Sequence, residues 1–155
     1  MSINLIQLRD LVVIPALKEI QLYNKAAMRL VIGTGIVEFG YEYIHQINGP
    51  ALGFWQCEPA TYKDIYENYL LFNLPLAQKL NAFSIGHHKD AGQLVWNLKY
   101  AAAICRIHYL RVKKPLPHEN DILGMAHYYK DHYNTKLGKA TYEDFLNKAS
   151  LVLEL

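Results

Sequence analysis

The stretch "DAGQLVWNLKYAAAICRIHYLRV", residues 90–112, decides the fold. It is alanine-rich and apolar on most of its faces, a pattern typical of a helix that other elements surround on all sides. The sequence therefore predicts one long helix here, at the centre of the hydrophobic core.

The preceding segments indicate further helices that pack around this centre. Pro15 suits the first turn of a helix, and residues 16–44 continue with apolar side chains at steps of three and four. Gly33 and Gly35 weaken this helix by about 1 kcal/mol each relative to alanine. They predict either a break or kink at that point or a close contact with another element.

The remaining chain has the same helical character, with no more than weak hints of strand alternation. Thr61 is the predicted N-cap of one helix, and Pro75 is expected to interrupt the next. The other expected elements are a turn at 49–53, a loop at 113–121, a helix at 121–134, and a loop followed by a closing helix at 135–155. The expected fold class is mainly α, with a single domain over residues 1–155.

Composition limits the function classes. The 155 residues are 52% hydrophobic and 19% charged, which is enough to bury a core without disulfides. Sixteen basic and fourteen acidic residues give too even a balance for a nucleic-acid surface, so no nucleic-acid partner is expected. No apolar run approaches the roughly 18 residues of a membrane span, so no stable membrane insertion is expected.

Two features indicate where the chain is made. Cys57 and Cys105 lack a CxxC partner and are predicted to be buried free thiols of a protein made in a reducing compartment. The first residues lack the basic region of a signal peptide. We therefore expect synthesis in the cytoplasm without a signal peptide.

Glu38 places a carboxyl group in an apolar helical segment, shortly before the Gly-rich turn "GPALGFWQ" at 49–56. Apolar neighbours such as Val37 and Phe39 remove water from the carboxyl group. Desolvation raises its pKa above the usual value near 4.3, so that it holds a proton at neutral pH. The setting predicts a general acid.

The spacing after Glu38 resembles that of the soluble lytic transglycosylases, a family of the lysozyme superfamily. There, a catalytic Glu is followed by a G-A-x-G-L-M-Q segment and then by a Pro. Here Gly53, Gln56 and Pro59 follow Glu38 at the family's offsets of 15, 18 and 21 residues.

Two further segments are similar to the same family and occur in the same order. "NLKYAAAI" at 97–104 resembles its N-L-x-x-G-x-x-Y-L helix, and "HYNTKLG" at 132–138 resembles its closing A-Y-N-x-G. The chain departs from the pattern at Phe39, where Ser is usual, and at Trp55, where Met is usual. Its length and lack of a signal peptide resemble phage-encoded members.

The resemblance implies a single lysozyme-like domain that cleaves the β-1,4 bond between N-acetylmuramic acid and N-acetylglucosamine in peptidoglycan. Glu38 would protonate the leaving oxygen and then accept the proton of the muramic acid C6 hydroxyl, which closes a 1,6-anhydro ring. The candidate substrate-binding residues are Gly53, Trp55, Gln56, Tyr133 and Asn134. No cofactor is expected.

The partners implied are peptidoglycan glycan strands, with phage virion proteins as further candidates. Action on the cell wall by a chain without a signal peptide implies delivery by phage, either at host lysis or from the virion during entry.

Alternatives remain at this stage. A hydrolytic muramidase (lysozyme) would use Glu38 with a positioned water or a second carboxylate, for which Glu42, one helical turn later, Glu58 and Asp64 are candidates. A non-catalytic virion or glycan-binding module would keep the fold without turnover. Seven histidines occur without an HExxH pattern, so no metal is expected.

Overall fold

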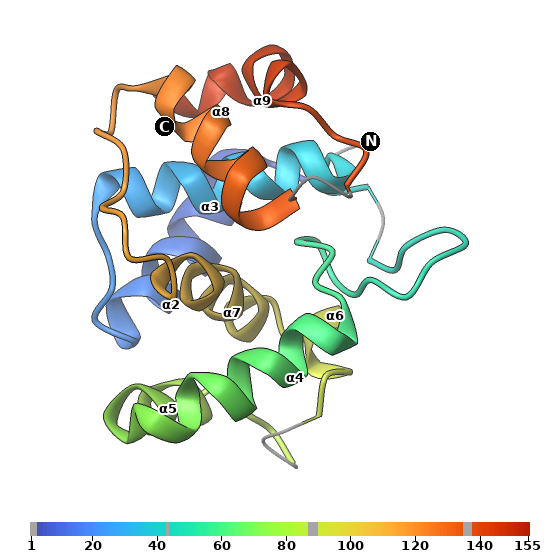
Figure 1. Cartoon of the computed structure of the whole chain (residues 1–155), viewed down its shortest axis with the longest axis vertical. Helices are drawn as coiled ribbons and strands as arrows, with labels where there is room; N and C mark the ends of the chain where they lie inside the picture. The colour runs from blue at the N-terminus through green and yellow to red at the C-terminus, as the bar shows by residue number, and fades with distance from the viewer. Residues whose placement is uncertain (1–2, 43, 87–89, 135–137) are drawn as a thin grey trace.

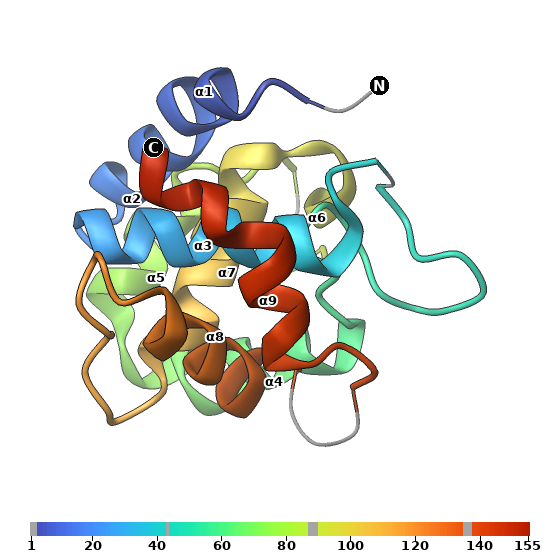
Figure 2. The same ribbon diagram turned by 90° about the horizontal axis from the view of Figure 1, so that it is seen from above.

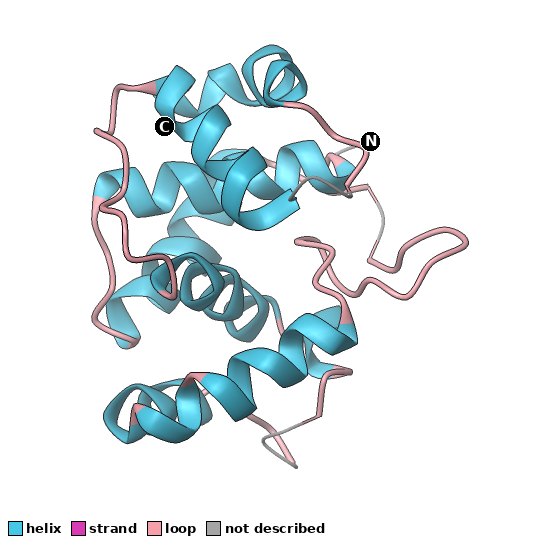
Figure 3. Ribbon diagram, in the orientation of Figure 1, coloured by secondary structure: helices cyan, strands magenta, loops and turns pink. Residues whose placement is uncertain are grey.

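The computed structural model describes residues 3–42, 44–86, 90–134 and 138–155, apart from the side chain of Phe39. Over these residues the chain is mainly helical and forms no strand, which confirms the mainly-α prediction (Figure 3). The helical elements are α1 (Leu5–Leu8), η1 (Arg9–Val13), α2 (Ile14–Glu19), α3 (Lys25–Phe39), α4 (Pro59–Asn68), η2 (Leu70–Phe72), α5 (Leu74–Asn81), α6 (Gln93–Trp96), α7 (Leu98–Leu110), α8 (Ile122–Tyr129), η3 (Lys130–Asn134), α9 (Tyr142–Ala149) and η4 (Ser150–Glu154). Of the η elements, η1 and η3 are π-helical, and η2 and η4 are 3-10 turns.

Helix α7 is the centre of the molecule, as residues 90–112 predict. Nearly every side chain from Tyr100 to Tyr109 is buried. Helices α2, α3, α4 and α6 all contact α7, while α8 and α9 cover the other side of α3 (Figures 1 and 2).

The prediction of one unbroken helix over 90–112 is wrong at its N-terminal end. Asn97 leaves the helical region, with φ −100° and ψ 86°, and separates α6 from α7. Its Oδ1 accepts a hydrogen bond from the Tyr100 N–H at 3.2 Å, and its Nδ2 donates to the Phe83 carbonyl at 2.8 Å. Asn97 is therefore an N-cap that also braces a neighbouring loop.

The long helix predicted over 16–44 is two helices, α2 and α3. The chain leaves α2 after Glu19, and Asn24 starts α3 by accepting a 2.7 Å hydrogen bond from the Ala27 N–H. An Asn side chain competes for backbone donors in this way, which favours a helix start over a helix interior.

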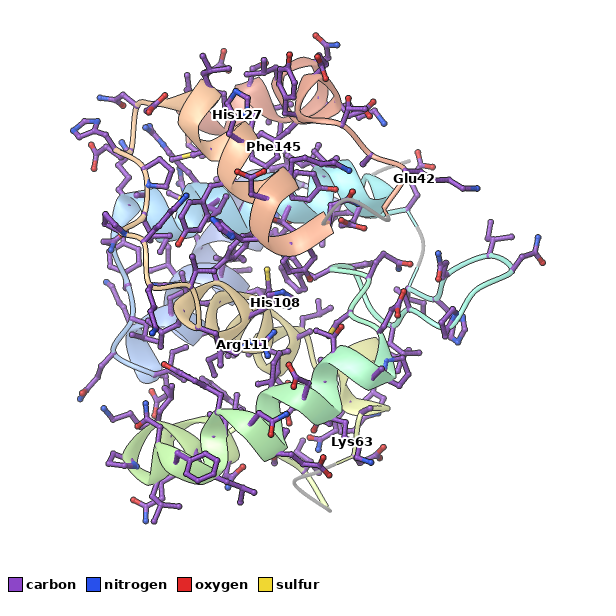
Figure 4. The ribbon with its side chains drawn as sticks, in the orientation of Figure 1. Glu42, Lys63, His108, Arg111, His127 and Phe145 are labelled. Carbon is purple, nitrogen blue, oxygen red and sulfur yellow. The ribbon has the colours of Figure 1, made fainter. Side chains whose placement is uncertain are left out.

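Gly33 and Gly35 do not break α3, so the close-contact alternative is the correct one. A Cβ on Gly33 would lie 2.5 Å from the Phe145 ring, which points from α9 toward α3 (Figure 4). A Cβ on Gly35 would overlap the Tyr41 ring. Both glycines let aromatic side chains pack directly against the backbone of α3.

Two other helix starts differ from the prediction. Helix α4 begins with Pro59 in its first turn after Glu58, so Thr61 lies inside the helix and is not its N-cap. Pro75 opens α5 behind the cap Asn73 and does not interrupt a helix. Proline fits the first turn because its missing N–H would have no helix partner there. The turn near 49–53, the loop at 113–121 and the two C-terminal helical segments are confirmed.

Both cysteines are buried free thiols, as predicted. Burial raises the pKa of Cys57 to about 12, so its reactive thiolate is scarce at neutral pH. Among the described residues, no helix is both long and apolar enough to cross a bilayer.

Candidate functional site

Glu38 lies in the last turn of α3, at the end from which the loop of residues 44–57 projects (Figures 1 and 2). Gly40 and Tyr41 follow with φ of 61° and 57°, so the helix stops directly after the carboxylate. Glu42 is exposed on this turn (Figure 4). The expectation that Glu42 lies one helical turn after Glu38 is wrong, because the chain leaves the helix between them.

The carboxyl group of Glu38 turns inward, toward α7 and α8. The Tyr129 hydroxyl, on a fully buried side chain of α8, donates a 2.7 Å hydrogen bond to Glu38 Oε1. Burial raises the pKa values of Tyr109 and Tyr133, and the charge of Glu38 adds to both shifts. Tyr129 thus bonds directly to the carboxyl group, and Tyr109 of α7 and Tyr133 of η3 are close enough for its charge to act on them.

Two opposing effects act on the pKa of Glu38, and the upward one is larger. Burial raises the pKa because the carboxylate loses hydration. The hydrogen bonds from Tyr129 and Asn134 and the charge of Lys130 lower it, because each favours the ionised form. Glu38 therefore holds its proton to a higher pH than an exposed Glu, yet its carboxylate has donors once the proton has left.

Lys130 fixes the orientation of Asn134. Its ammonium group donates to Asn134 Oδ1 at 2.9 Å and to the carbonyl oxygens of Gly138 and Ala140 at 3.0 and 2.7 Å. These three bonds use all three of its donors. Because the Asn134 oxygen is occupied, its NH₂ group is left to face Glu38, in agreement with its lowering of the Glu38 pKa.

Two side chains bond back to α3, one from the loop of residues 44–57 and one from the turn before it. Trp55 Nε1 donates to the Val31 carbonyl at 2.8 Å, and the Tyr41 hydroxyl donates to the Ile32 carbonyl at 2.8 Å. The Tyr133 hydroxyl donates to the Trp55 carbonyl at 2.6 Å, which ties η3 to the same loop. The segments that contain Glu38, Trp55 and Tyr133 thus meet in space.

Gly53 and Gln56 shape the turn within this loop. Gly53 has φ 71°, and a Cβ there would overlap the Leu94 carbonyl oxygen, so both the φ value and the close approach of α6 require glycine. Gln56 also has a positive φ, 47°, and its Nε2 donates to the Gly53 carbonyl at 2.7 Å.

The five candidate substrate-binding residues therefore differ in what they present to solvent. Trp55 is 1% exposed and Gln56 is 8% exposed, so these two side chains fix the loop and offer little surface to a glycan. Tyr133 and Asn134 are partly buried next to Glu38. Contact of any of them with substrate stays a prediction.

The other candidate acids, Glu58 and Asp64, make no described contact with Glu38 or its hydrogen-bond donors. Glu58 is exposed at the start of α4. Asp64 is exposed, pairs with Arg111 and accepts a 2.6 Å hydrogen bond from Asn68 Nδ2. No contact in the described part of the chain joins either of them to Glu38.

Two residues of the site were not predicted from the sequence. Tyr129 donates a hydrogen bond to Glu38, and Lys130 orients Asn134. One signal was present: Tyr129 precedes Tyr133 by four residues, which places both on one face of a helix. Nothing in the sequence distinguishes Lys130 from the other lysines.

In the described ranges, no three or more His, Cys, Asp or Glu side chains are grouped to hold a metal ion. His87 and His88, the adjacent histidines of the sequence, lie outside those ranges. The residues around Glu38 are suited to proton transfer, since they comprise one carboxyl group with a raised pKa and several N–H and O–H donors.

Searches of family models, of curated proteins and of solved structures each found no match. What the site does is therefore inferred from its residues and geometry and from the resemblance of the sequence segments that form it.

Proposed function

We propose that this protein is a peptidoglycan lytic transglycosylase with Glu38 as general acid and base. The observation that carries the proposal is that separate segments meet around the part of α3 that ends in Glu38. Glu38 on α3, the loop with Trp55, and Tyr133 and Asn134 on η3 are linked by hydrogen bonds and electrostatic contacts. These are segments in which the sequence resembles the family.

The environment of Glu38 supports both halves of the proposed reaction. Its raised pKa provides a carboxylic acid that protonates the leaving oxygen of N-acetylglucosamine as the C1–O bond breaks. The carboxylate then formed is stabilised by Tyr129, Asn134 and Lys130. It takes the proton of the muramic acid C6 hydroxyl as that oxygen bonds to C1, which closes the 1,6-anhydro ring and returns Glu38 to its acid form.

The contacts of the second-acid candidates favour this route over hydrolysis. A hydrolase needs a base that positions water, and a separate carboxylate usually supplies it. Glu42 and Glu58 are exposed, and Asp64 is engaged by Arg111. In transglycosylation the nucleophile belongs to the substrate, so one carboxyl group is sufficient.

Mass spectrometry of the products released from purified peptidoglycan tests the proposal. Wild-type protein should release muropeptides with 1,6-anhydromuramic ends. Glu38→Gln should release none, whereas the matched control Glu42→Gln should act like wild type because that side chain is exposed. Reducing-end products that depend on Glu38 would instead show a hydrolytic muramidase. Folded protein that releases nothing in any variant would favour a glycan-binding or virion module.

The proposed substrate lies outside the cytoplasmic membrane, so the proposal includes delivery by phage, at lysis or from the virion. A secretory leader encoded upstream of Met1 would contradict this part.

A further inference from the structure

A pocket of about 460 Å³ opens to solvent at the N-terminal end of α3, the end opposite to Glu38. Its walls are residues 24–26 at the start of α3, Arg106 of α7, and residues 116–119 of the loop before α8. The start of α3 and that loop lie side by side at the left edge of Figure 1. With a rise of 1.5 Å per residue, α3 separates this pocket from Glu38 by about 20 Å.

Arg106 is the residue that indicates a ligand. Its side chain is 6% exposed, and its Nε and Nη1 are buried with no hydrogen-bond acceptor in the described part of the chain. A buried guanidinium group without acceptors is costly, and guanidinium groups stay charged in proteins. The groups that act on it electrostatically are Tyr128, Cys105 and Tyr69, none of which carries a fixed negative charge.

The start of α3 adds a second set of donors to the same pocket. Asn24 satisfies the N–H of Ala27, which leaves the backbone N–H groups of Lys25 and Ala26 without an acceptor inside the helix. Free N–H groups at a helix start attract anions, and α3 is 15 residues long. The side chains of Lys25 and His118 also line the pocket.

We propose that this pocket binds a phosphoryl group, from either a phosphate monoester or a phosphodiester. Arg106 supplies a guanidinium group, which suits phosphoryl oxygens, at one wall of the pocket, and Lys25 and Ala26, whose N–H groups have no helix partner, lie at another wall. The volume lies within the roughly 300–1,000 Å³ typical of small-molecule sites, which leaves room for the organic part of an ester. The site is separate from the one proposed to cleave glycans.

Glu119 also lines the pocket, and its carboxylate opposes an anion there. Its backbone carbonyl accepts a 2.9 Å hydrogen bond from Arg29 Nη1, which holds this part of the loop in place. No described ion pair joins Glu119 to Arg106. Replacement of Glu119 therefore separates two possibilities. In the first, the pocket is an anion site and the Glu119 carboxylate weakens binding there. In the second, the Glu119 carboxylate is itself the partner of Arg106.

The test measures calorimetric binding and the shift in Tm with inorganic phosphate, methyl phosphate and dimethyl phosphate, with ionic strength held constant by sodium chloride. Wild type should bind at least one of these, with a Tm that rises with ligand concentration. Arg106→Gln should weaken binding at least tenfold and Lys25→Ala severalfold, whereas Glu119→Gln should strengthen it. Lys99→Ala, an exposed lysine of α7, is the matched control and should bind like wild type.

Tighter binding of methyl phosphate would identify a monoester, and tighter binding of dimethyl phosphate a diester. The proposal is overturned if wild type responds to phosphate no more than to chloride. It is also overturned if Lys25→Ala and Lys99→Ala weaken binding equally, or if Glu119→Gln abolishes binding. The Lys25 and Glu119 variants decide the matter even if Arg106→Gln does not fold, because Lys25 is exposed and Glu119 is only partly buried.

Discussion

Mild acid should destabilise this protein through His108, a partly buried residue of α7. His108 Nε2 lies 3.1 Å from the His132 carbonyl oxygen, while Nδ1 is buried and has no partner in the described structure. The neutral ring fits this site, with Nε2 as the donor. Protonation would add a buried N–H at Nδ1 without an acceptor, near the positive charge of Arg111 (Figure 4).

The size of the effect follows from the pKa of His108. Burial, and after it the charge of Arg111, lowers this pKa from 6.5 to about 4. As the pH falls below 6.5, the unfolded chain takes up a proton that the folded protein accepts only near pH 4. The stability contributed by the neutral ring is therefore present above pH 6.5 and is lost in this window. The loss in the free energy of unfolding is about 3 kcal/mol, at 1.36 kcal/mol for each pKa unit.

Urea unfolding at several pH values between 7 and 4 measures this loss. His108→Gln keeps a donor and an acceptor but cannot be protonated, so it should lose about 3 kcal/mol less than wild type over this range. His127→Gln is the matched control, because His127 is exposed beside Tyr142, and it should lose as much as wild type. Equal losses in wild type and His108→Gln would refute the reasoning.

Four further changes test the site itself. Glu38→Gln should be more stable than wild type at pH 7, and urea unfolding should show the gain disappear below pH 4.5, since the raised pKa makes the folded protein favour the protonated form. Tyr129→Phe removes a donor that lowers the Glu38 pKa, so the high-pH limb of the cleavage profile should move upward. Gly53→Ala should lower the free energy of unfolding by about 2 kcal/mol or more, because of its positive φ and the overlap with α6; an unchanged urea midpoint would contradict this. Tyr133→Phe loses one hydrogen bond to the loop and should lower that free energy by about 1 kcal/mol in the same assay.

The sequence predicts those parts of the fold that depend on the local spacing of apolar residues. Residues 90–112 are apolar on most faces, and this is sufficient to place α7 at the centre. The errors fall at helix starts such as Asn24 and Asn97. At each of these, the Asn side chain accepts a hydrogen bond from the backbone N–H three residues later. The spacing of apolar residues does not predict such a bond.

The candidate site is predictable only in part, for a different physical reason. The apolar neighbourhood of Glu38 correctly predicts a raised pKa. The groups that interact with the carboxyl group, however, include Tyr109 and Tyr129, which lie far from it in sequence. Whether Trp55 faces a groove or the core is likewise set by tertiary packing, because a Trp ring with one N–H suits either place.

The buried position of Trp55 also bears on what the Gly-rich turn contributes. Its ring packs at an angle against Tyr41 and Phe54, and its Nε1 and carbonyl oxygen bond to α3 and to Tyr133. The Trp55 side chain thus bonds to α3, and the Trp55 main chain bonds to η3, the element that carries Tyr133 and Asn134. The turn therefore acts on the proposed chemistry through position. Residue 55 therefore acts on the surroundings of Glu38 through the position of the loop, since its side chain is 1% exposed and offers little surface to a ligand.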